Sequence, residues 1–239
     1  LNEQGEVSVD ELAKRFETSE VTIRKDLAAL ESNGLLLRRY GGAITMPQEL
    51  VGDAAQPVSA YKRAIARAAV VRLREHARII IDSGSTTAAM IPELGHQPGL
   101  VVMTNSLNVA RALSELEHEP VLLMTGGTWD PHSDSFQGQV AEQVLRSYDF
   151  DQLFIGADGI DLQRGTTTFN ELLGLSRVMA EVAREVVVMV ESDKIGRKIP
   201  NLELPWSSVH TLITDDRLPL EARDQIQARG ITLICAAVI

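Results

Sequence analysis

The 239-residue sequence predicts an α/β protein in two parts: a small helical segment, then a larger, mostly parallel sheet covered by helices. Three observations predict it. Helix caps and a strand hairpin occupy residues 1–46, two prolines interrupt residues 47–58, and beyond them runs of Val, Ile and Leu alternate with helical periods. We therefore expect one domain over 1–46, a linker over 47–58 and a second domain over 59–239.

The composition is that of an ordinary globular protein, with 44% hydrophobic and 23% charged residues and a net charge of −10. No apolar run approaches the ~18 residues of a membrane span, and no signal-peptide pattern is present. A single cysteine, Cys235, fits a reducing cytoplasm, and the histidines lack metal-ligand spacing. We expect no membrane association, metal or cofactor. We also expect a missing helical turn before Leu1, because the first residues read as a helix end closed by Gly5.

A first short helix is predicted from a capping box, in which Ser8 and Glu11 each satisfy a free backbone N–H group. Its apolar stripe of Leu12, Ala13 and Phe16 is expected to be buried.

A second helix is predicted from Ser19, which can cap it, to about Asn33. Its inner face follows the helical period, with Ile23, Leu27 and Leu30. The opposite face carries a hydroxyl and two basic side chains near the N-terminal end: Thr22, Arg24 and Lys25. Such a face suits a helix whose first turns approach DNA.

A basic hairpin follows, with Leu35–Tyr40 as a strand, Gly41-Gly42 as the turn, and Ala43-Ile44 in the return strand. Helix, turn, helix and hairpin in this order predict a winged helix-turn-helix. The predicted DNA-binding residues are Ser19, Thr22, Arg24, Lys25, Arg38, Arg39 and Tyr40, with the last three on the wing and facing phosphates. The alternative is a small helical cap with a solvated charged face.

Four segments of this region closely resemble the DeoR family of bacterial regulators: Val7–Ala13, Ser19–Leu27, Leu30–Gly34 and Arg39–Ala43. Tyr40 departs from the family, since many members have histidine there. The resemblance implies that residues 20–33 form the recognition helix.

The second domain is predicted to have strands at Arg78–Asp82, Leu100–Thr104, Val121–Met124, Gln152–Ile155, Val186–Val190, Thr211–Thr214 and Ile231–Cys235. Helices are predicted at Ser59–His76, Ser106–Glu117, Gln139–Tyr148, Glu171–Glu185 and Leu218–Arg229. Apolar strands alternating with helices indicate a largely parallel sheet with helices on both faces.

Small polar residues gather where these strands end, which is where open α/β sheets bind ligands. Glycines and hydroxyls after the first strand suit an anion, Asn105 suits a sugar hydroxyl, and Lys194 can neutralise a phosphate. Each alone is explained at least as well by capping, by a tight turn or, for Lys194, by a solvated surface lysine, but together they predict a pocket for a small polyhydroxylated anion. The predicted ligand residues are Asp82, Ser83, Gly84, Ser85, Thr86, Thr87, Thr104, Asn105, Ser106, Gly126, Gly127, Asp158, Gly159 and Lys194.

These motifs also resemble the sensor domain of the DeoR family, from about Lys62 to about Asp216. That resemblance implies a fold like ribose-5-phosphate isomerase and related sugar-phosphate enzymes. The segments Met103–Leu107, Gly156–Leu162, Thr167–Glu171 and Lys194–Lys198 look most like the glucitol (sorbitol) operon repressors, which implies a hexitol phosphate such as glucitol 6-phosphate as inducer.

The function expected from this resemblance is repression of a sugar or sugar-alcohol operon. A homodimer or homotetramer would hold repeated operator sites and leave them when a phosphorylated sugar or sugar alcohol binds. The alternative is a sugar-phosphate isomerase-like enzyme. Isomerases carry a carboxylate where this sequence has Gly159, so we expect no catalytic residues, although Asp158 and Asp161 keep the alternative open.

Overall fold

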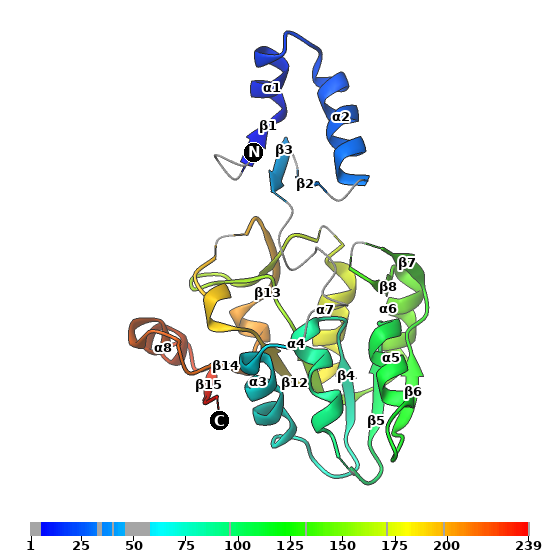
Figure 1. Cartoon of the computed structure of the whole chain (residues 1–239). Helices are drawn as coiled ribbons and strands as arrows, with labels where there is room; N and C mark the ends of the chain where they lie inside the picture. Colours follow the sequence, from blue (N-terminus) through cyan, green and yellow to red (C-terminus); the bar gives the residue numbers. More distant parts are fainter. Residues whose placement is uncertain are drawn as a thin grey trace. The chain divides into compact units, whose positions relative to one another are not determined.

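The computed structural model describes residues 6–32, 35–39, 41–45, 58–95, 97–131, 133–170, 172–197 and 199–238. The chain divides into two compact units, Leu1–Gln56 and Pro57–Ile239, which we call the head and the C-terminal domain (Figure 1).

The head contains two helices and a three-stranded antiparallel sheet of order β1-β3-β2. Its elements are β1 (Glu6–Ser8), α1 (Val9–Arg15), α2 (Glu20–Ser32), β2 (Leu36–Arg39) and β3 (Gly42–Thr45). Both predicted caps are present. The Ser8 hydroxyl accepts the backbone N–H of Glu11 at 3.5 Å, and the Ser19 hydroxyl accepts that of Thr22 at 3.1 Å. The predicted winged helix-turn-helix order is therefore confirmed.

Two expected core residues of the head are instead exposed. Phe16 is 64% exposed because it lies just past the last residue of α1, and Val9, at the first helical position, is buried with Ala13. Leu30 is 39% exposed, whereas Ile23 and Leu27 are buried as predicted.

The wing turn lies one residue earlier than predicted. Arg39 pairs with Gly42, so Gly42 belongs to β3 and not to the turn. Gly42 also pairs with Ser8 of β1, and a Cβ atom there would lie only 2.1 Å from the Val7 carbonyl oxygen. Glycine is therefore required at this position by the unpredicted strand β1, whereas Gly41, at φ +78°, serves the turn.

The C-terminal domain is built on a seven-stranded parallel sheet of order β15-β14-β12-β9-β4-β5-β6. All seven predicted strands are present: β4 (Arg78–Ile81), β5 (Val101–Thr104), β6 (Val121–Met124), β9 (Phe150–Ile155), β12 (Ala183–Met189), β14 (Thr211–Asp215) and β15 (Thr232–Ala236). The helices are α3 (Ala60–Val70), α4 (Ser85–Ala88), α5 (Leu107–Ser114), α6 (Gln139–Arg146), α7 (Gly174–Glu181) and α8 (Leu220–Gln227), with 3₁₀ turns η2 (Ile91–Glu93), η3 (Ser192–Lys194) and η4 (Trp206–Ser208).

Helices cover both faces of the sheet, so the domain has three layers (Figure 1). Successive side chains of a strand point to opposite faces. In β4, Ile79 and Ile81 belong to the same core cluster as side chains of α3, α4 and α5, whereas Ile80 belongs to the cluster that includes side chains of α6, α7 and α8. The buried run of β-branched residues predicted for a parallel sheet is thereby confirmed. In the part of the chain that the structure describes, no helix is both long and apolar enough to cross a membrane.

Several helices are shorter than predicted. Helix α3 ends at Val70 and not at His76. Helix α7 covers only Gly174–Glu181, because Ala183–Glu185 belong to β12. The structure also contains two small antiparallel sheets that were not predicted, β7-β8 and β10-β11-β13. Their strands are β7 (Thr128–Asp130), β8 (Ser135–Gln137), β10 (Gly159–Asp161), β11 (Gly165–Thr168) and β13 (Asn201–Pro205).

Candidate DNA-binding head and ligand site

The outer face of α2 presents the predicted polar residues to solvent. Thr22, Arg24 and Lys25 are all exposed. Arg24 forms an ion pair with Glu20 at 2.6 Å, and the two side chains are 57% and 49% exposed. Exposed pairs of this kind contribute little stability, so the guanidinium can exchange its carboxylate for a phosphate or a base edge at small cost. The Ser19 hydroxyl caps the helix and lies 2.9 Å from the Thr22 hydroxyl.

The wing is fastened to α2 through Arg38. Its Nε donates to Glu31 at 2.7 Å and its backbone N–H donates to the same carboxylate at 2.8 Å. Arg38 therefore positions the wing against α2 as well as offering charge to a phosphate. The predicted contacts of the Arg39 side chain and of Tyr40 lie outside the described residues.

The carboxyl ends of β4, β5 and β9 lie side by side at the centre of the sheet. Ile81 is in register with Thr104 on one side and Phe154 on the other. The loops beyond approach closely, since a Cβ atom on Gly84 would lie 3.8 Å from the Gly156 Cα. The structure thus brings together the predicted ligand residues of three strands.

Several predicted ligand hydroxyls already have partners that shape these loops. Thr87 donates to the Asp82 carbonyl at 2.9 Å, and Thr104 accepts the backbone N–H of Ser106 at 3.1 Å. Ser106 caps α5 by accepting the N–H of Val109 at 3.3 Å. Thr86, Thr87, Thr104 and Ser106 are buried. For Thr87, Thr104 and Ser106, the alternative of local capping and turn contacts describes the observed hydrogen bonds.

Asn105 differs from its neighbours. It is 1% exposed, and its Oδ1 atom has no hydrogen-bond partner. An unpartnered buried acceptor is rare and costs about 1–3 kcal/mol. Ser85 is exposed, and its Oγ receives a hydrogen bond from Lys62 Nζ at 3.0 Å. Lys62 was not among the predicted site residues, because it lies 23 positions earlier, on α3.

The loop after β9 is joined to β11. Asp158 accepts hydrogen bonds from the Thr168 hydroxyl at 2.7 Å and the Phe169 N–H at 3.0 Å. Gly159 is buried, and a Cβ atom there would lie 2.9 Å from Thr167 Oγ1. A side chain at position 159 would therefore require the side chains of Thr167 and Ile199 to shift. Lys194, half-buried, ends η3 and precedes Ile195, which bridges to Ile160 of β10.

A buried carboxyl of β13, Glu203, was not predicted. Its oxygens accept hydrogen bonds from Ser176 at 2.8 Å and Thr166 at 3.3 Å. Burial, with the nearby charge of Asp82, raises the pKa of Glu203 to about 8. Burial likewise raises the pKa of the Asp82 carboxyl, against hydrogen bonds from Ser83 and Asn105. Acidic groups thus lie close together beneath the strand ends.

Gly126 and Gly127 have conformational roles in the turn between β6 and β7. Their φ angles are +58° and +113°, and a Cβ atom on Gly127 would lie 2.5 Å from the Gln137 carbonyl oxygen. The tight-turn alternative accounts for them. No cluster of metal-ligating side chains occurs within the described ranges.

A winged helix-turn-helix followed by an α/β domain with polar strand ends defines the class of ligand-responsive transcription regulators. Comparison with known families agrees. Residues 1–49 match the DeoR-like helix-turn-helix domain, and residues 58–216 match the DeoR C terminal sensor domain. The chain belongs to the DeoR family, and it is a DNA-binding regulator and not an enzyme.

Similar curated proteins cover nearly the whole chain. A protein of Escherichia coli O157:H7, provisionally named the aga operon transcriptional repressor, is 39% identical over 98% of this chain and 89% of its own length. The HTH-type transcriptional regulator GlpR of Haloferax volcanii is 31% identical over 95% of this chain and 90% of its own.

Solved structures resemble the chain at the level of fold. Ribose 5-phosphate isomerase A from Methanocaldococcus jannaschii is 22% identical with a TM-score of 0.42, over 56% of this chain and only 53% of that enzyme. RipA from Yersinia pestis is 11% identical with a TM-score of 0.50, over 81% of this chain and 59% of its own.

Proposed function

We propose that the chain represses a sugar or sugar-alcohol operon by holding operator DNA with its head until a phosphorylated sugar or sugar alcohol occupies the strand-end site of the sensor domain. One observation carries this proposal. A cation, an exposed hydroxyl and an unpartnered buried acceptor lie near the ends of β4 and β5, and they belong to Lys62, Ser85 and Asn105. A regulator of this kind would act in the cytoplasm.

The chemistry of these groups suits the proposed effector. Lys62 and Ser85 can neutralise and hydrogen-bond a phosphate, with Lys194 as a second cation. The Asn105 Oδ1 atom needs a donor, which a sugar hydroxyl supplies. Asp82 and Asp158 offer further acceptors for hydroxyl groups. A polyhydroxylated monophosphate satisfies all of these groups together.

The proposed effector is a hexitol phosphate, and glucitol 6-phosphate is the first compound to test. The sequence resemblance to glucitol repressors favours it, whereas a 39% identical relative carries the name of the aga operon. Hexose phosphates therefore belong in the same panel.

On the DNA side, we propose that α2 enters the major groove with Thr22, Arg24 and Lys25 foremost, while the wing contacts backbone phosphates. A dimer or tetramer would present two such helices to a repeated site.

The test has two steps. Duplexes that bind the full chain are first selected from a random pool, to define a preferred site. Site-bound protein is then titrated with glucitol 6-phosphate, other hexitol phosphates and hexose phosphates, while fluorescence anisotropy follows the DNA. We expect sequence-selective binding and release by one phosphorylated compound but not by its unphosphorylated form. Absence of any preferred duplex, or release by none of the panel, contradicts the proposal.

A further inference from the structure

The outer face of α2 carries an apolar side chain that the fold of the head does not use. Val21, in the first turn of α2, is 72% exposed, whereas Ile23 is 6% exposed and Leu27 is 4% exposed. Residues two positions apart point to nearly opposite sides of a helix. Val21 therefore lies opposite the side of α2 that packs into the core of the head.

The polar neighbours of Val21 differ in how far they are already engaged. The Thr22 hydroxyl lies 2.9 Å from the hydroxyl of Ser19, which caps the helix. Lys25 is exposed and lies one turn after Val21, so the two side chains share one side of α2. This side of the helix thus presents an apolar group next to a cation.

The following turn of the same side consists of small residues. Ala28 and Ala29 follow Lys25 by three and four positions, which places them next to it on the helix surface. Ala29 is exposed and Ala28 is half-buried. Because their methyl groups project little, the helix can approach a flat or grooved partner closely without burying a charge.

Duplex DNA is the partner that fits this surface. Residues 1–49 match a helix-turn-helix domain, and the residues at the start of a recognition helix contact base edges. Lys25 supplies the charge that complements the duplex. The base edges of the major groove present hydrogen-bond donors and acceptors, and their apolar group is the C5-methyl of thymine. Valine makes no side-chain hydrogen bond, and in a helix its branched side chain keeps one preferred rotamer, so its methyl groups have a fixed position.

We propose that Val21 helps to determine the operator sequence by packing against the C5-methyl group of a thymine in the major groove. This inference rests on the proposed function, in which α2 enters that groove. The contact buries one methyl group of the base, so its loss should weaken binding about fourfold.

The test compares thymine with uracil, which lacks the C5-methyl group and keeps the same base pair. In the duplex selected by the full-length chain, thymines are replaced by uracil one at a time, and fluorescence anisotropy measures the affinity. We expect the wild type to lose about fourfold at a contacted thymine. Val21→Ala should bind the thymine and uracil duplexes equally at that position. Each variant is compared with itself, so a general change in its stability cancels from the ratio.

A second pair of duplexes returns the methyl group on another base. The contacted thymine is replaced by cytosine or by 5-methylcytosine, which carries its methyl group at the same ring position. We expect the wild type to bind the methylated duplex about fourfold more tightly than the unmethylated one. Val21→Ala should not distinguish them.

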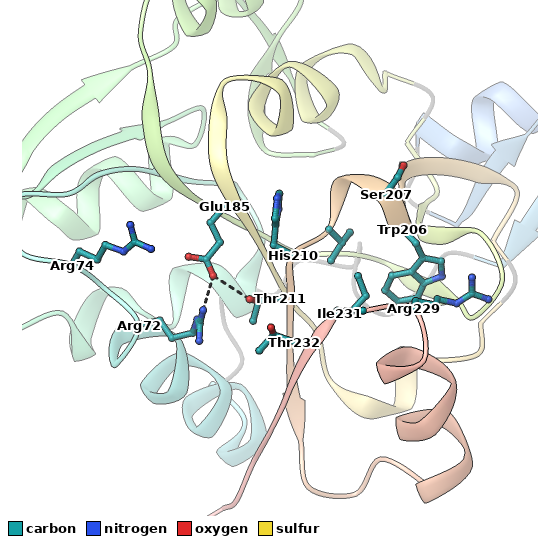
Figure 2. A pocket seen from close by; sticks show the side chains of 12 residues that line it. Arg72, Arg74, Glu185, Trp206, Ser207, His210, Thr211, Arg229, Ile231 and Thr232 are labelled. Atoms are coloured by element: carbon teal, nitrogen blue, oxygen red, sulfur yellow. Dashed lines mark hydrogen bonds and ion pairs between the residues drawn. The ribbon is translucent and has the colours of Figure 1, made fainter.

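Val71→Ala is the matched control, because Val71 is 85% exposed but lies at the C-terminal end of α3, in the other domain. It should discriminate thymine from uracil as the wild type does. Trp206 reports whether the sensor domain is intact. Figure 2 shows it beside Arg229, whose guanidinium lies 5.9 Å from the centre of the ring. In a full-length Trp129→Phe background Trp206 is the one tryptophan, and its fluorescence should follow the same urea unfolding in both valine variants as without them.

The outcomes separate this inference from the proposed function. Failure to select any preferred duplex overturns both. A preferred duplex in which no thymine methyl group affects binding, or in which its effect persists in Val21→Ala, overturns only the role of Val21. So does a Val21→Ala variant that changes the sedimentation mass of the free protein and keeps the thymine preference, because Val21 would then lie between subunits.

Discussion

At the scale of single residues, Asn105 stands apart because its neighbours are satisfied and it is not. Thr104 and Ser106 use their hydroxyls inside the loop, whereas Oδ1 of Asn105 is buried without a donor. An unpartnered acceptor of this kind lowers stability by about 1–3 kcal/mol, and a donor supplied by a bound effector would offset that cost. The proposed effector gives it a function.

Replacing Asn105 with alanine should therefore affect release and not DNA binding. We expect unchanged operator affinity and at least about tenfold more effector for half-release, the effect of losing one buried hydrogen bond. Anisotropy titration measures both. Thr214→Val is the matched control, because Thr214 Oγ1 is also buried and unpartnered but lies on β14. If the two variants release alike, Asn105 does not contact the effector.

Glu203 makes the stability of the sensor domain depend on pH. Its pKa of about 8 lies above the value of 4.5 for an unperturbed glutamic acid, so the unfolded state loses this proton first. Stability is thus greatest below pH 4.5 as far as this group is concerned, and it falls as pH rises towards 8. Glu203→Gln removes the titration while keeping the shape of the side chain.

We expect urea unfolding to show Glu203→Gln more stable than the wild type at pH 8, by at least about 2 kcal/mol. The difference should shrink steadily towards pH 5, where the wild-type carboxyl is neutral in the folded state. Glu181→Gln, an exposed glutamate of α7, is the control and should show no such trend. A difference that is constant with pH would mean that Glu203 is already ionised when folded.

At the scale of elements, long periodic segments could be predicted and short strands could not. The seven strands of the parallel sheet contain runs such as Arg78–Ile81, whose isoleucines are buried on both faces and leave a clear pattern. In contrast, β1 has only three residues, Glu6–Ser8, and is defined by pairing with β3, 34 to 38 positions away. Its pairing is the reason that Gly42 was mistaken for a turn residue.

The sheet β10-β11-β13 was missed for a related reason. Its central strand, Gly165–Thr168, is rich in threonine and reads equally well as a loop that caps a helix. Only its burial between β10 and β13 makes it a strand, and that depends on chain more than 30 residues away. Tertiary contacts override a weak local signal here.

Gly42→Ala tests the role assigned to β1. A Cβ atom 2.1 Å from the Val7 carbonyl oxygen cannot be accommodated without separating β1 from β3. We expect the head to lose at least about 2 kcal/mol of stability, and operator binding with it. The sensor domain should unfold at its usual midpoint, as followed by Trp206 fluorescence in the Trp129→Phe background. Gly41→Ala is the control, because a Cβ atom there meets nothing within 4 Å and only the positive φ is strained.

At the scale of the whole molecule, only those site residues that follow the carboxyl ends of parallel strands could be predicted from the sequence. Parallel strands place their carboxyl ends at one edge, which correctly grouped Asp82, Asn105 and Asp158. Lys62 lies on α3 and Glu203 lies on β13, and neither residue follows the end of a predicted strand. Their positions at the site are visible only in the folded chain. Hydroxyls that cap helices and hydroxyls that bind ligands also look identical in a sequence.

The two-domain division makes a final prediction about separable functions. Arg24→Ala should weaken operator binding by about 1–3 kcal/mol and relax sequence preference if the guanidinium reads a base, while leaving effector binding unchanged.

Ser85→Ala and Lys194→Ala should keep operator affinity but weaken the release of the operator by the effector. Moving occupancy from 99:1 to 1:99 requires the effector to prefer the released state by about 5.5 kcal/mol, so loss of one phosphate contact should leave a measurable fraction bound at saturation. Operator titrations with and without the effector separate the two effects. Normal release by both sensor variants would contradict the placement of the phosphate at the strand-end site. Unaltered operator affinity in Arg24→Ala would contradict a DNA contact by that residue.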